Sequence, residues 1–525
     1  MSMHYILPGI LRYIGHLPLC SLAINGLTRK RICEIIKIQQ IPRQERDDVN
    51  NDRGIFLSAT AAAKPKKYDL TQGPIFKGLI KLSVPIMATS LMQTAHNLIG
   101  MFWLGMLGSD YIAAAGLAGQ FLWLSMAFIF MCRIGTEIGV SQNMGKGDVE
   151  AAKLYSQNGF MLAFGIGTIY GIVAFVFRGQ LIGFFSIPSD YVADISARYL
   201  AIIALCIPFQ FGHFLITGIY NGFGNTKIPM YINTGALVIN IILSPIFIFV
   251  LGFGVYGAAI ALVVAQILNF AVKIWAMTKY KNRPFKDYVP FAKIIGGKIT
   301  QILRWGLPVG GESFIFTILF MIVSRLIVSE FGPGASAAHS VALQVESMSF
   351  MVGGGFASAV TAFVGQNFGA RKWGRLRRTF RVSTLFMAAY GLFVTIVLFF
   401  FADPLMSLFL DCPEEIRIGG DYLRIIAATQ LLFCMEGAAI GSFRGRGQTM
   451  KPAVASVVCN IIRVLVAYIL ATTLFGFGFN IGITGVWIGI AVAVTLRAVW
   501  VLIWHKLNIR SMPKVDAEKI EEVKA

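Results

Sequence analysis

Three glutamates stand inside apolar stretches in the second half of the chain, namely Glu312, Glu346 and Glu436. A charged side chain in the middle of a membrane costs about 2.5 to 3.5 kcal/mol and usually faces a cavity or an ion pathway. Counting about 1.5 Å per residue along each predicted helix places the three carboxyl groups in one band of the membrane. Such a cluster can exchange a proton for Na⁺ near neutral pH, because burial raises the pKa of a carboxyl group and a nearby cation lowers it. The alternative is that each glutamate only hydrogen-bonds a neighbouring helix.

A second set of polar residues in apolar stretches could line a substrate cavity. The set is His96, Asn97, His213, Asn460 and Arg463. Each could instead be a hydrogen-bonded packing residue. Arg463, like Arg325, could pair with a glutamate or extend to the membrane surface. Arg133 and Glu137 have the i, i+4 spacing that predicts a local ion pair on one helix.

Motifs that would power or catalyse a reaction are missing from the sequence. No G-x-x-x-x-G-K-[ST] loop is present to cradle phosphates, so we expect no use of ATP. The G-x-G-x-x-G pattern at 252–257 lies between two apolar segments with no strand before it, which indicates a turn. HExxH, G-x-S-x-G and paired His/Cys clusters are missing too. The sequence predicts no enzyme, no metal site and no cofactor apart from a coupling ion, Na⁺ or H⁺.

The composition is that of a membrane protein. Of 525 residues, 56% are hydrophobic and only 14% are charged, and the mean hydropathy is +0.69. Soluble domains carry about a quarter charged residues, so a soluble enzyme is excluded. The net charge of +20 does not indicate a nucleic-acid partner, because Lys and Arg are spread over alternate loops and not gathered on one soluble face.

Twelve apolar segments follow one another, each long enough for a transmembrane helix. They are 79–105, 111–144, 153–178, 190–220, 228–251, 256–279, 300–329, 335–368, 379–402, 416–443, 452–475 and 483–505. Closed β-barrels would show short alternating segments instead. One set of loops holds 28 Lys and Arg, whereas the opposite set holds Arg178 and Arg417. The positive-inside rule therefore predicts a multi-pass protein of the cell membrane with both termini cytoplasmic.

The two halves of the sequence resemble each other at an offset of 223 or 224 residues. The repeated residues include Gln142, Asn143, Gly145 and Gly222, which recur as Gln366, Asn367, Gly369 and Gly445. His213 has Glu436 as its counterpart. Six spans separate the copies, so both halves have the same orientation and the repeat is parallel.

These patterns predict an all-α membrane protein with twelve transmembrane helices in two pseudo-symmetric six-helix lobes. The N-lobe is expected at 71–298 and the C-lobe at 299–510. Residues 1–70 are expected to form a disordered or amphipathic extension, and residues 511–525 a charged cytoplasmic tail.

Several stretches resemble the multidrug and toxic compound extrusion (MATE) family. They are 82–85, 97–108, 243–248, 252–259, 337–350, 364–370 and 444–449. The resemblance covers residues 79 to about 507 and implies two six-helix lobes around a V-shaped cavity. Acidic residues common in two N-lobe helices of the family are Gly100 and Ser244 here. The glutamates at 312, 346 and 436 look like the C-lobe carboxylates of a prokaryotic branch.

The hypothesis that follows is a cation-coupled antiporter that exports organic, cationic or amphipathic compounds by alternating access. Its expected partners are the small organic substrate and membrane lipid, and we expect a monomer. The alternative in the same superfamily is a flippase for a lipid-linked precursor, for which Arg325, Arg463 and Arg497 would have to hold a pyrophosphate. A channel or a non-transporting scaffold is disfavoured by the two-lobe repeat.

Overall fold

Long apolar helices make up most of the protein, as lipid requires, because a helix satisfies its backbone polar groups internally. The computed structural model describes residues 69–185, 189–472 and 481–513, without the side chains of 94–98, 101, 109, 110 and 333. Nearly all of the predicted extension at 1–70, and most of the tail at 511–525, lies outside these ranges. Residues 68–525 form one unit.

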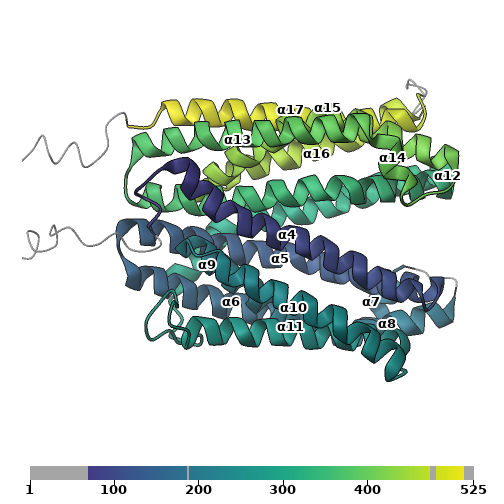
Figure 1. Cartoon of the computed structure of the whole chain (residues 1–525), viewed down its shortest axis with the longest axis horizontal. Helices are drawn as coiled ribbons and strands as arrows, with labels where there is room; N and C mark the ends of the chain where they lie inside the picture. The colour runs from purple at the N-terminus through teal and green to yellow at the C-terminus, as the bar shows by residue number, and fades with distance from the viewer. Residues whose placement is uncertain (1–68, 186–188, 473–480, 514–525) are drawn as a thin grey trace, which may run out of the picture. The chain divides into compact units, whose positions relative to one another are not determined.

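The first half of this unit is a helical bundle, coloured purple to teal in Figure 1. In chain order it contains α4 (Ile75–Gly105), α5 (Ser109–Lys146), α6 (Val149–Val176), α7 (Arg178–Gly183), α8 (Asp190–Ala204), α9 (Ile207–Phe223), α10 (Lys227–Pro245), the π-helix η2 (Ile246–Val250) and α11 (Gly254–Thr278). Helices α8 and α9 meet at a bend of 49° and together make one broken span.

The second half repeats this arrangement in green to yellow (Figure 1). It contains α12 (Gly296–Gly369), α13 (Trp373–Phe400), α14 (Ala402–Ser407), α15 (Pro413–Gly445), α16 (Met450–Ala471) and α17 (Ile483–Arg510). Helix α12 consists of a first arm (296–331) and a second arm (334–369), which meet at Gly332 with φ at 81°, a conformation that glycine adopts at no steric cost. The described ranges hold 11 helices able to span a membrane, or 12 with the bent α8–α9 pair counted as one span. The predicted twelve-span fold is confirmed.

The sequence repeat extends to individual backbone hydrogen bonds. The Asp148 N–H donates to the Asn143 carbonyl at the turn after α5, and the Lys372 N–H donates to the Asn367 carbonyl at the turn after α12, both at 3.0 Å. The Asp148 side chain then caps α6 by accepting from the Ala151 N–H at 2.8 Å. Equivalent turns therefore end α5 and the second arm of α12.

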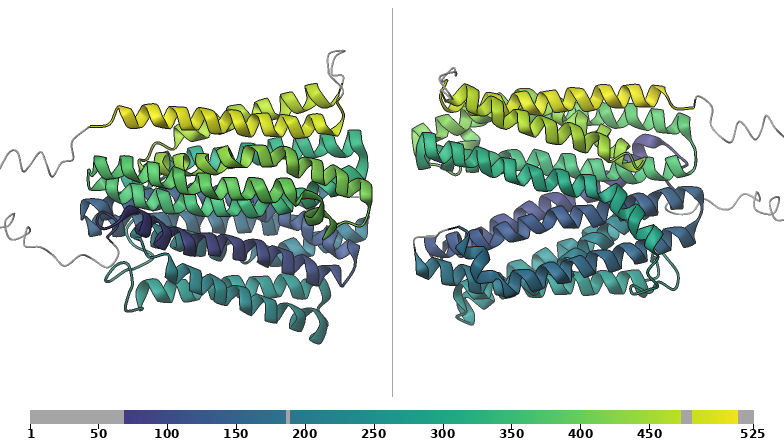
Figure 2. Two further views of the ribbon diagram at one scale, coloured as in Figure 1. Left: turned by 45° about the horizontal axis from the view of Figure 1, so that its top comes forward. Right: turned by 180° about the vertical axis from the view of Figure 1, so that it is seen from behind.

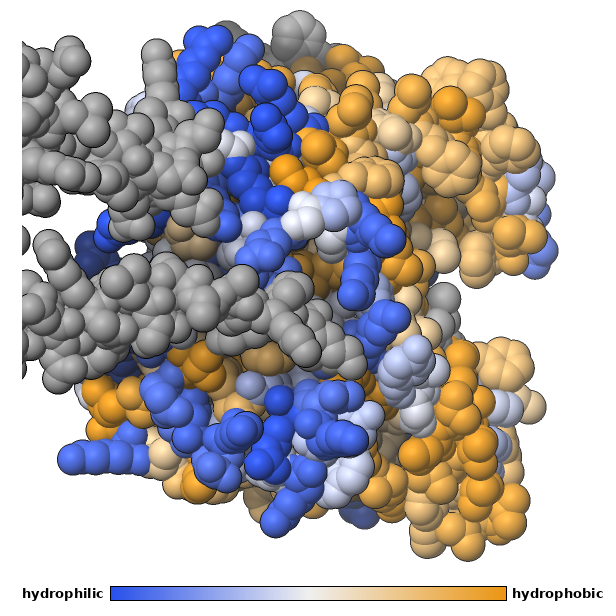
Figure 3. Space-filling view, turned by 60° about the vertical axis from the view of Figure 1, so that its left-hand side comes forward, coloured by the Kyte–Doolittle hydropathy of each residue, from blue (hydrophilic) through white to orange (hydrophobic). Residues whose placement is uncertain are grey.

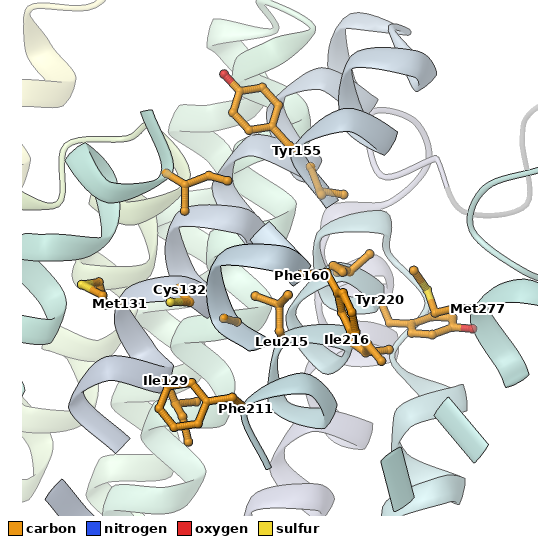
Figure 4. Packing of buried hydrophobic residues seen from close by; sticks show 14 of the residues in the cluster. Ile129, Met131, Cys132, Tyr155, Phe160, Phe211, Leu215, Ile216, Tyr220 and Met277 are labelled. Carbon is orange, nitrogen blue, oxygen red and sulfur yellow. The ribbon is translucent and has the colours of Figure 1, made fainter. Parts of the chain in front are cut away.

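Each half buries an apolar core of its own. In the N-lobe, Phe160 from α6, Ile216 and Tyr220 from α9 and Met277 from α11 lie together, and Phe211 of α9 lies beside Ile129 of α5 in the same core (Figure 4). The C-lobe has a second core around the fully buried Tyr422 and Trp487. Large hydrophobic residues also cover the outer sides of the bundles (Figure 3), as expected of surfaces that face lipid.

The first helix of each lobe packs partly against the other lobe. Leu79 and Leu82 at the start of α4 share a core with Phe356 and Phe363 from the second arm of α12. In the reverse direction, Gly306 in the first arm of α12 lies against α5 so closely that an added Cβ would come within 2.0 Å of the Met131 carbonyl oxygen. The two lobes are thus interlocked by exchanged helices.

The lobes meet at one end of the molecule, where α5 and the second arm of α12 end and basic turns follow them. Gln142 Nε2 donates to the Gly445 carbonyl at 2.9 Å, and its repeat counterpart Gln366 donates to the Gly222 carbonyl at 3.0 Å. From this end the two bundles diverge (Figure 2). Hydrophilic residues gather on the same end (Figure 3). The repeated residues of the sequence therefore form the contact between the lobes.

Replacing Gly145 with alanine is expected to destabilise the protein, because the new Cβ would lie 1.9 Å from the Gln366 carbonyl oxygen. Overpacking of this kind costs about 1–3 kcal/mol. Thermal unfolding in detergent should show a lower midpoint for Gly145→Ala. The control is Gly165→Ala in α6, where no atom lies within 4 Å of the added Cβ. Equal midpoints for Gly145→Ala and wild type would contradict this account of the lobe contact.

Candidate functional site

The C-lobe buries an ion pair between Glu436 on α15 and Arg497 on α17. Glu436 Oε1 lies 2.9 Å from Arg497 Nε, and the Glu436 side chain is 1% exposed. The guanidinium of Arg497 also lies 5.9 Å from the centre of the Phe433 ring. A carboxylate this far from water requires a countercharge, and Arg497 supplies it.

Arg444, on the last turn of α15, connects this pair to a second glutamate. Its Nη2 lies 3.9 Å from Oε2 of Glu312 on the first arm of α12. It also interacts electrostatically with Glu436 and, across the lobe contact, with Glu137 on α5. Glu312 and Glu436 interact with each other as well. Arg444 therefore pairs with Glu312 and interacts electrostatically with carboxylates of both lobes.

Glu137 completes the connection between the lobes. It pairs with Arg133 at 4.0 Å, which confirms the ion pair predicted from their spacing. In addition, Ser358 on the second arm of α12 donates to Glu137 Oε1 at 2.9 Å, and Asn221 on α9 donates to Ser358 Oγ at 3.2 Å. We refer to Glu137, Glu312, Glu436, Arg133, Arg444 and Arg497 as the ion network.

Glu346 lies in separate surroundings within the C-lobe. The Tyr422 hydroxyl donates to its Oε2 at 2.5 Å, and Gln430 Nε2 lies 3.4 Å from its Oε1. Arg463, which is buried, interacts with it electrostatically. The structure thus groups Glu312 with Glu436 and gives Glu346 a different set of partners.

The residues expected to line a substrate cavity are divided between the lobes. His213 is buried in the N-lobe, whereas Asn460 and Arg463 are buried one turn apart on α16 of the C-lobe. Asn460 Nδ2 lies 3.4 Å from Ser456 Oγ. His96 and Asn97 belong to α4, but their side chains lie outside the described residues. Arg463 of this set interacts electrostatically with a predicted glutamate, Glu346.

A cavity of about 110 Å³ lies within the N-lobe. Its walls come from α4, α5, α9, α10 and α11, and the polar residues among them include Gln93, Arg133, His213, Thr217, Asn221, Asn233 and Asn269. Among the described residues that line it, none carries a carboxylate.

The surroundings of three buried charged residues could not be predicted from the sequence. Arg444 follows the predicted span 416–443 and is one of the 28 Lys and Arg expected in the basic loops, but α15 continues to Gly445 and places it in the last turn. Glu137 was expected to make only a local pair, because the contact with Ser358 depends on how the lobes pack. Lys273 lies near the end of α11, where a lysine can extend to the membrane surface, yet its side chain is fully buried. The one signal in the sequence was that no acidic residue lies near Lys273 along the chain.

A family model described as MatE matches residues 85–246 and again residues 308–469. The second match begins 223 residues after the first, which is the offset of the internal repeat. The chain belongs to the MatE family. MatE proteins are transporters and not enzymes, and they span the membrane several times.

Relatives of this MatE chain align over nearly their whole length. The probable multidrug resistance protein YoeA of Bacillus subtilis is 27% identical, covering 83% of this chain and 95% of YoeA. The probable multidrug resistance protein NorM of Thermotoga maritima is 26% identical over 84% of this chain and 96% of its own. A MOP superfamily transporter from Pyrococcus furiosus has the same fold, with a TM-score of 0.79 at 22% identity over 86% of this chain and all of its own.

Removing one partner of the Glu436–Arg497 pair is expected to destabilise this MatE transporter strongly. Arg497→Gln leaves a carboxylate unpaired and buried, which costs about 3–5 kcal/mol. The double variant Glu436→Gln/Arg497→Gln removes both charges and should recover most of that loss. The measurement is chemical unfolding in detergent.

The matched control for this pair is Arg198→Gln. Arg198 pairs with Asp194 at 2.9 Å, but both side chains are more than half exposed, so the loss should stay within about 1 kcal/mol. Additive losses in the double variant at 436 and 497 would show that the two groups do not stabilise each other.

Proposed function

We propose that the protein is a cation-coupled antiporter that exports organic compounds, with Na⁺ or H⁺ binding at Glu312 and Glu436. The observation that carries this proposal is the ion network, which joins these two C-lobe glutamates to Glu137 of the N-lobe through Arg444. A coupled transporter needs a physical link between the site that binds the driving ion and the contact between the lobes, which must open and close during transport. Arg444 provides such a link.

The proposed coupling follows from the charges of the network. Three carboxylates face three guanidinium groups, so one bound Na⁺ or H⁺ at Glu312 or Glu436 adds a positive charge beside Arg444 and Arg497. The attraction between Arg444 and the C-lobe glutamates then weakens, and its interaction with Glu137 across the lobe contact changes. Because Glu137 also accepts the hydrogen bond of Ser358, ion binding acts on the packing of α5 against the second arm of α12. A change in that packing would let the lobes alternate between two openings.

The membrane potential is large enough to drive such a cycle. Each positive charge that moves into the cell releases about 2.3 kcal/mol per 100 mV of membrane potential. This free energy can maintain a tens-fold concentration gradient of the exported compound for each ion that enters. We place the closed end in the cytoplasm, since the basic turns after α5 and α12 lie there. The diverging ends of the lobes then face outward, in the orientation from which a bound organic compound, cationic or amphipathic, would be released.

The flippase alternative receives no support from the arginines once assigned to it. Arg463 interacts with Glu346 and Arg497 pairs with Glu436, so neither is available to hold a pyrophosphate. Arg325 is exposed on the first arm of α12. We therefore retain the antiporter as the proposed function.

The coupling is tested in proteoliposomes with an imposed Na⁺ or H⁺ gradient. Efflux of two dyes, the cationic rhodamine 6G and the zwitterionic rhodamine B, is followed so that the test does not depend on substrate charge. Wild type should respond to one of the two gradients, and Glu312→Gln/Glu436→Gln should lose at least tenfold of the gradient-driven rate. Glu150→Gln, at an exposed carboxylate on α6, is the control. Full coupling in the double variant would refute the site.

The orientation can be tested with a native cysteine. Cys412 is exposed just before α15, whereas Cys132, Cys206, Cys434 and Cys459 are buried. If the closed end is cytoplasmic, a membrane-impermeant maleimide should modify Cys412 on intact cells, as located by mass spectrometry and absent in Cys412→Ser. Modification of Cys412 only after permeabilisation would reverse the proposed orientation.

A further inference from the structure

A short non-helical segment, residues 69–74, leads into α4. Thr71 folds it into a turn, because its backbone N–H and its hydroxyl both donate to Asp69 Oδ1, at 2.8 and 2.7 Å. Leu70 packs against the core that α4 shares with the second arm of α12, beside which the start of α4 lies (dark purple in Figure 1). We refer to residues 69–74 as the latch segment. It precedes the first N-lobe helix but packs on the C-lobe.

Arg375, on the first turn of α13, holds the latch segment by its backbone. Its Nη1 donates to the Gly73 carbonyl at 2.7 Å, and its Nη2 donates to the carbonyls of Gln72 at 2.9 Å and Leu70 at 3.2 Å. Asp69 also interacts with Arg375 electrostatically. A guanidinium group presents five N–H donors in one fixed plane. One side chain of the C-lobe can therefore bind three carbonyls of the latch segment at once.

The latch segment also orients Gln366, which makes the contact between the lobes. The Leu70 N–H donates to Gln366 Oε1 at 3.1 Å, and the neighbouring Asn367 donates to the Leu70 carbonyl at 3.2 Å. Gln366 Nε2 donates to the Gly222 carbonyl at 3.0 Å and to the Phe223 carbonyl at 3.2 Å. A side-chain amide carries its acceptor and its donors on different atoms. A donor fixed at Oε1 therefore directs Nε2 toward the N-lobe.

The segment that leads into α12 is held in a different way. Gln157 Nε2 on α6 donates to the Val289 carbonyl at 2.9 Å, and the Ile295 N–H donates to Asn158 Oδ1 at 2.7 Å. Neither bond involves Gln142, the equivalent glutamine of the lobe contact. The connection from a leading segment through a glutamine to the opposite lobe is therefore a property of the latch segment.

We propose that the latch segment holds the closed end of the molecule shut, with Arg375 as the positioning residue that keeps it in place. The proposal rests on the proposed alternation of the lobes and names an element that must yield when this end opens. For the lobes to part here, the bonds from Gln366 to Gly222 and Phe223 must break. Release of the latch segment from Arg375 frees the amide of Gln366 to turn away from the N-lobe, so Arg375 acts on the lobe contact through Gln366.

A cysteine at the lobe contact reports how often this end opens. Ser141 on α5 is fully buried and packs against Gly365, the residue before Gln366. The rate at which N-ethylmaleimide modifies Ser141→Cys in the full chain is measured in dodecyl maltoside by mass spectrometry, with no ion gradient. Adding Arg375→Ala should raise this rate at least fivefold. Adding Arg378→Ala, which removes an exposed arginine one turn further along α13, should leave it unchanged.

Two native cysteines in the same sample separate a latch from a general loss of stability. Cys132 on α5 and Cys434 on α15 are buried, and Arg375→Ala should leave their rates of modification unchanged. A parallel rise at both of them and at position 141 would give Arg375 a merely structural role and overturn the proposal. An unchanged rate at position 141 would overturn it too.

Asp69→Asn keeps the test decisive if Arg375→Ala fails to fold. It weakens the turn at Thr71 and removes the charge that faces Arg375, so the rate at position 141 should rise at least twofold, and an unchanged rate contradicts the latch. The parent Ser141→Cys reports on the alternation of the lobes by itself. A parent rate that changes with Na⁺ concentration or pH supports that alternation, even where equal rates in the parent and the variants refute the latch. Failure of the proposed function is thus distinguishable from failure of the latch.

Discussion

The close crossing of α5 with the second arm of α12 is the constraint on which the rest of the structure depends. Gln142 and Gln366 each donate to a carbonyl of the opposite lobe, and glycines at 145 and 369 allow the backbones to touch. This crossing lets Glu137 accept a hydrogen bond from Ser358 and interact electrostatically with Arg444. Without it, the C-lobe carboxylates would have no electrostatic connection to the N-lobe.

The two lobes share one architecture but differ in their charges. The C-lobe pairs glutamates with arginines, whereas the position equivalent to Glu436 in the N-lobe is an imidazole beside Lys273. Electrostatic interactions are strong in such buried surroundings, so equivalent positions of the two halves have different electrostatic environments.

Much of the fold could be predicted from the sequence, because hydrophobic segments, basic loops and the repeat are local or periodic signals. The approximate depth of Glu312 and Glu436 followed from helix geometry, and the Arg133–Glu137 pair from spacing. The partners of Arg444 and Lys273 could not be predicted in this way. A lysine near a helix end looks the same in sequence whether it reaches the surface or turns inward, and the packing of neighbouring helices decides between them.

The exchange of first helices has a consequence for the origin of the molecule. The start of α4 belongs to the core of the second half, and the start of α12 lies against α5. This is the geometry of a domain-swapped homodimer whose two subunits have been joined into a single polypeptide. An ancestral six-helix protein could have made the same exchange between two identical copies, with gene fusion later freeing each copy to acquire its own charges.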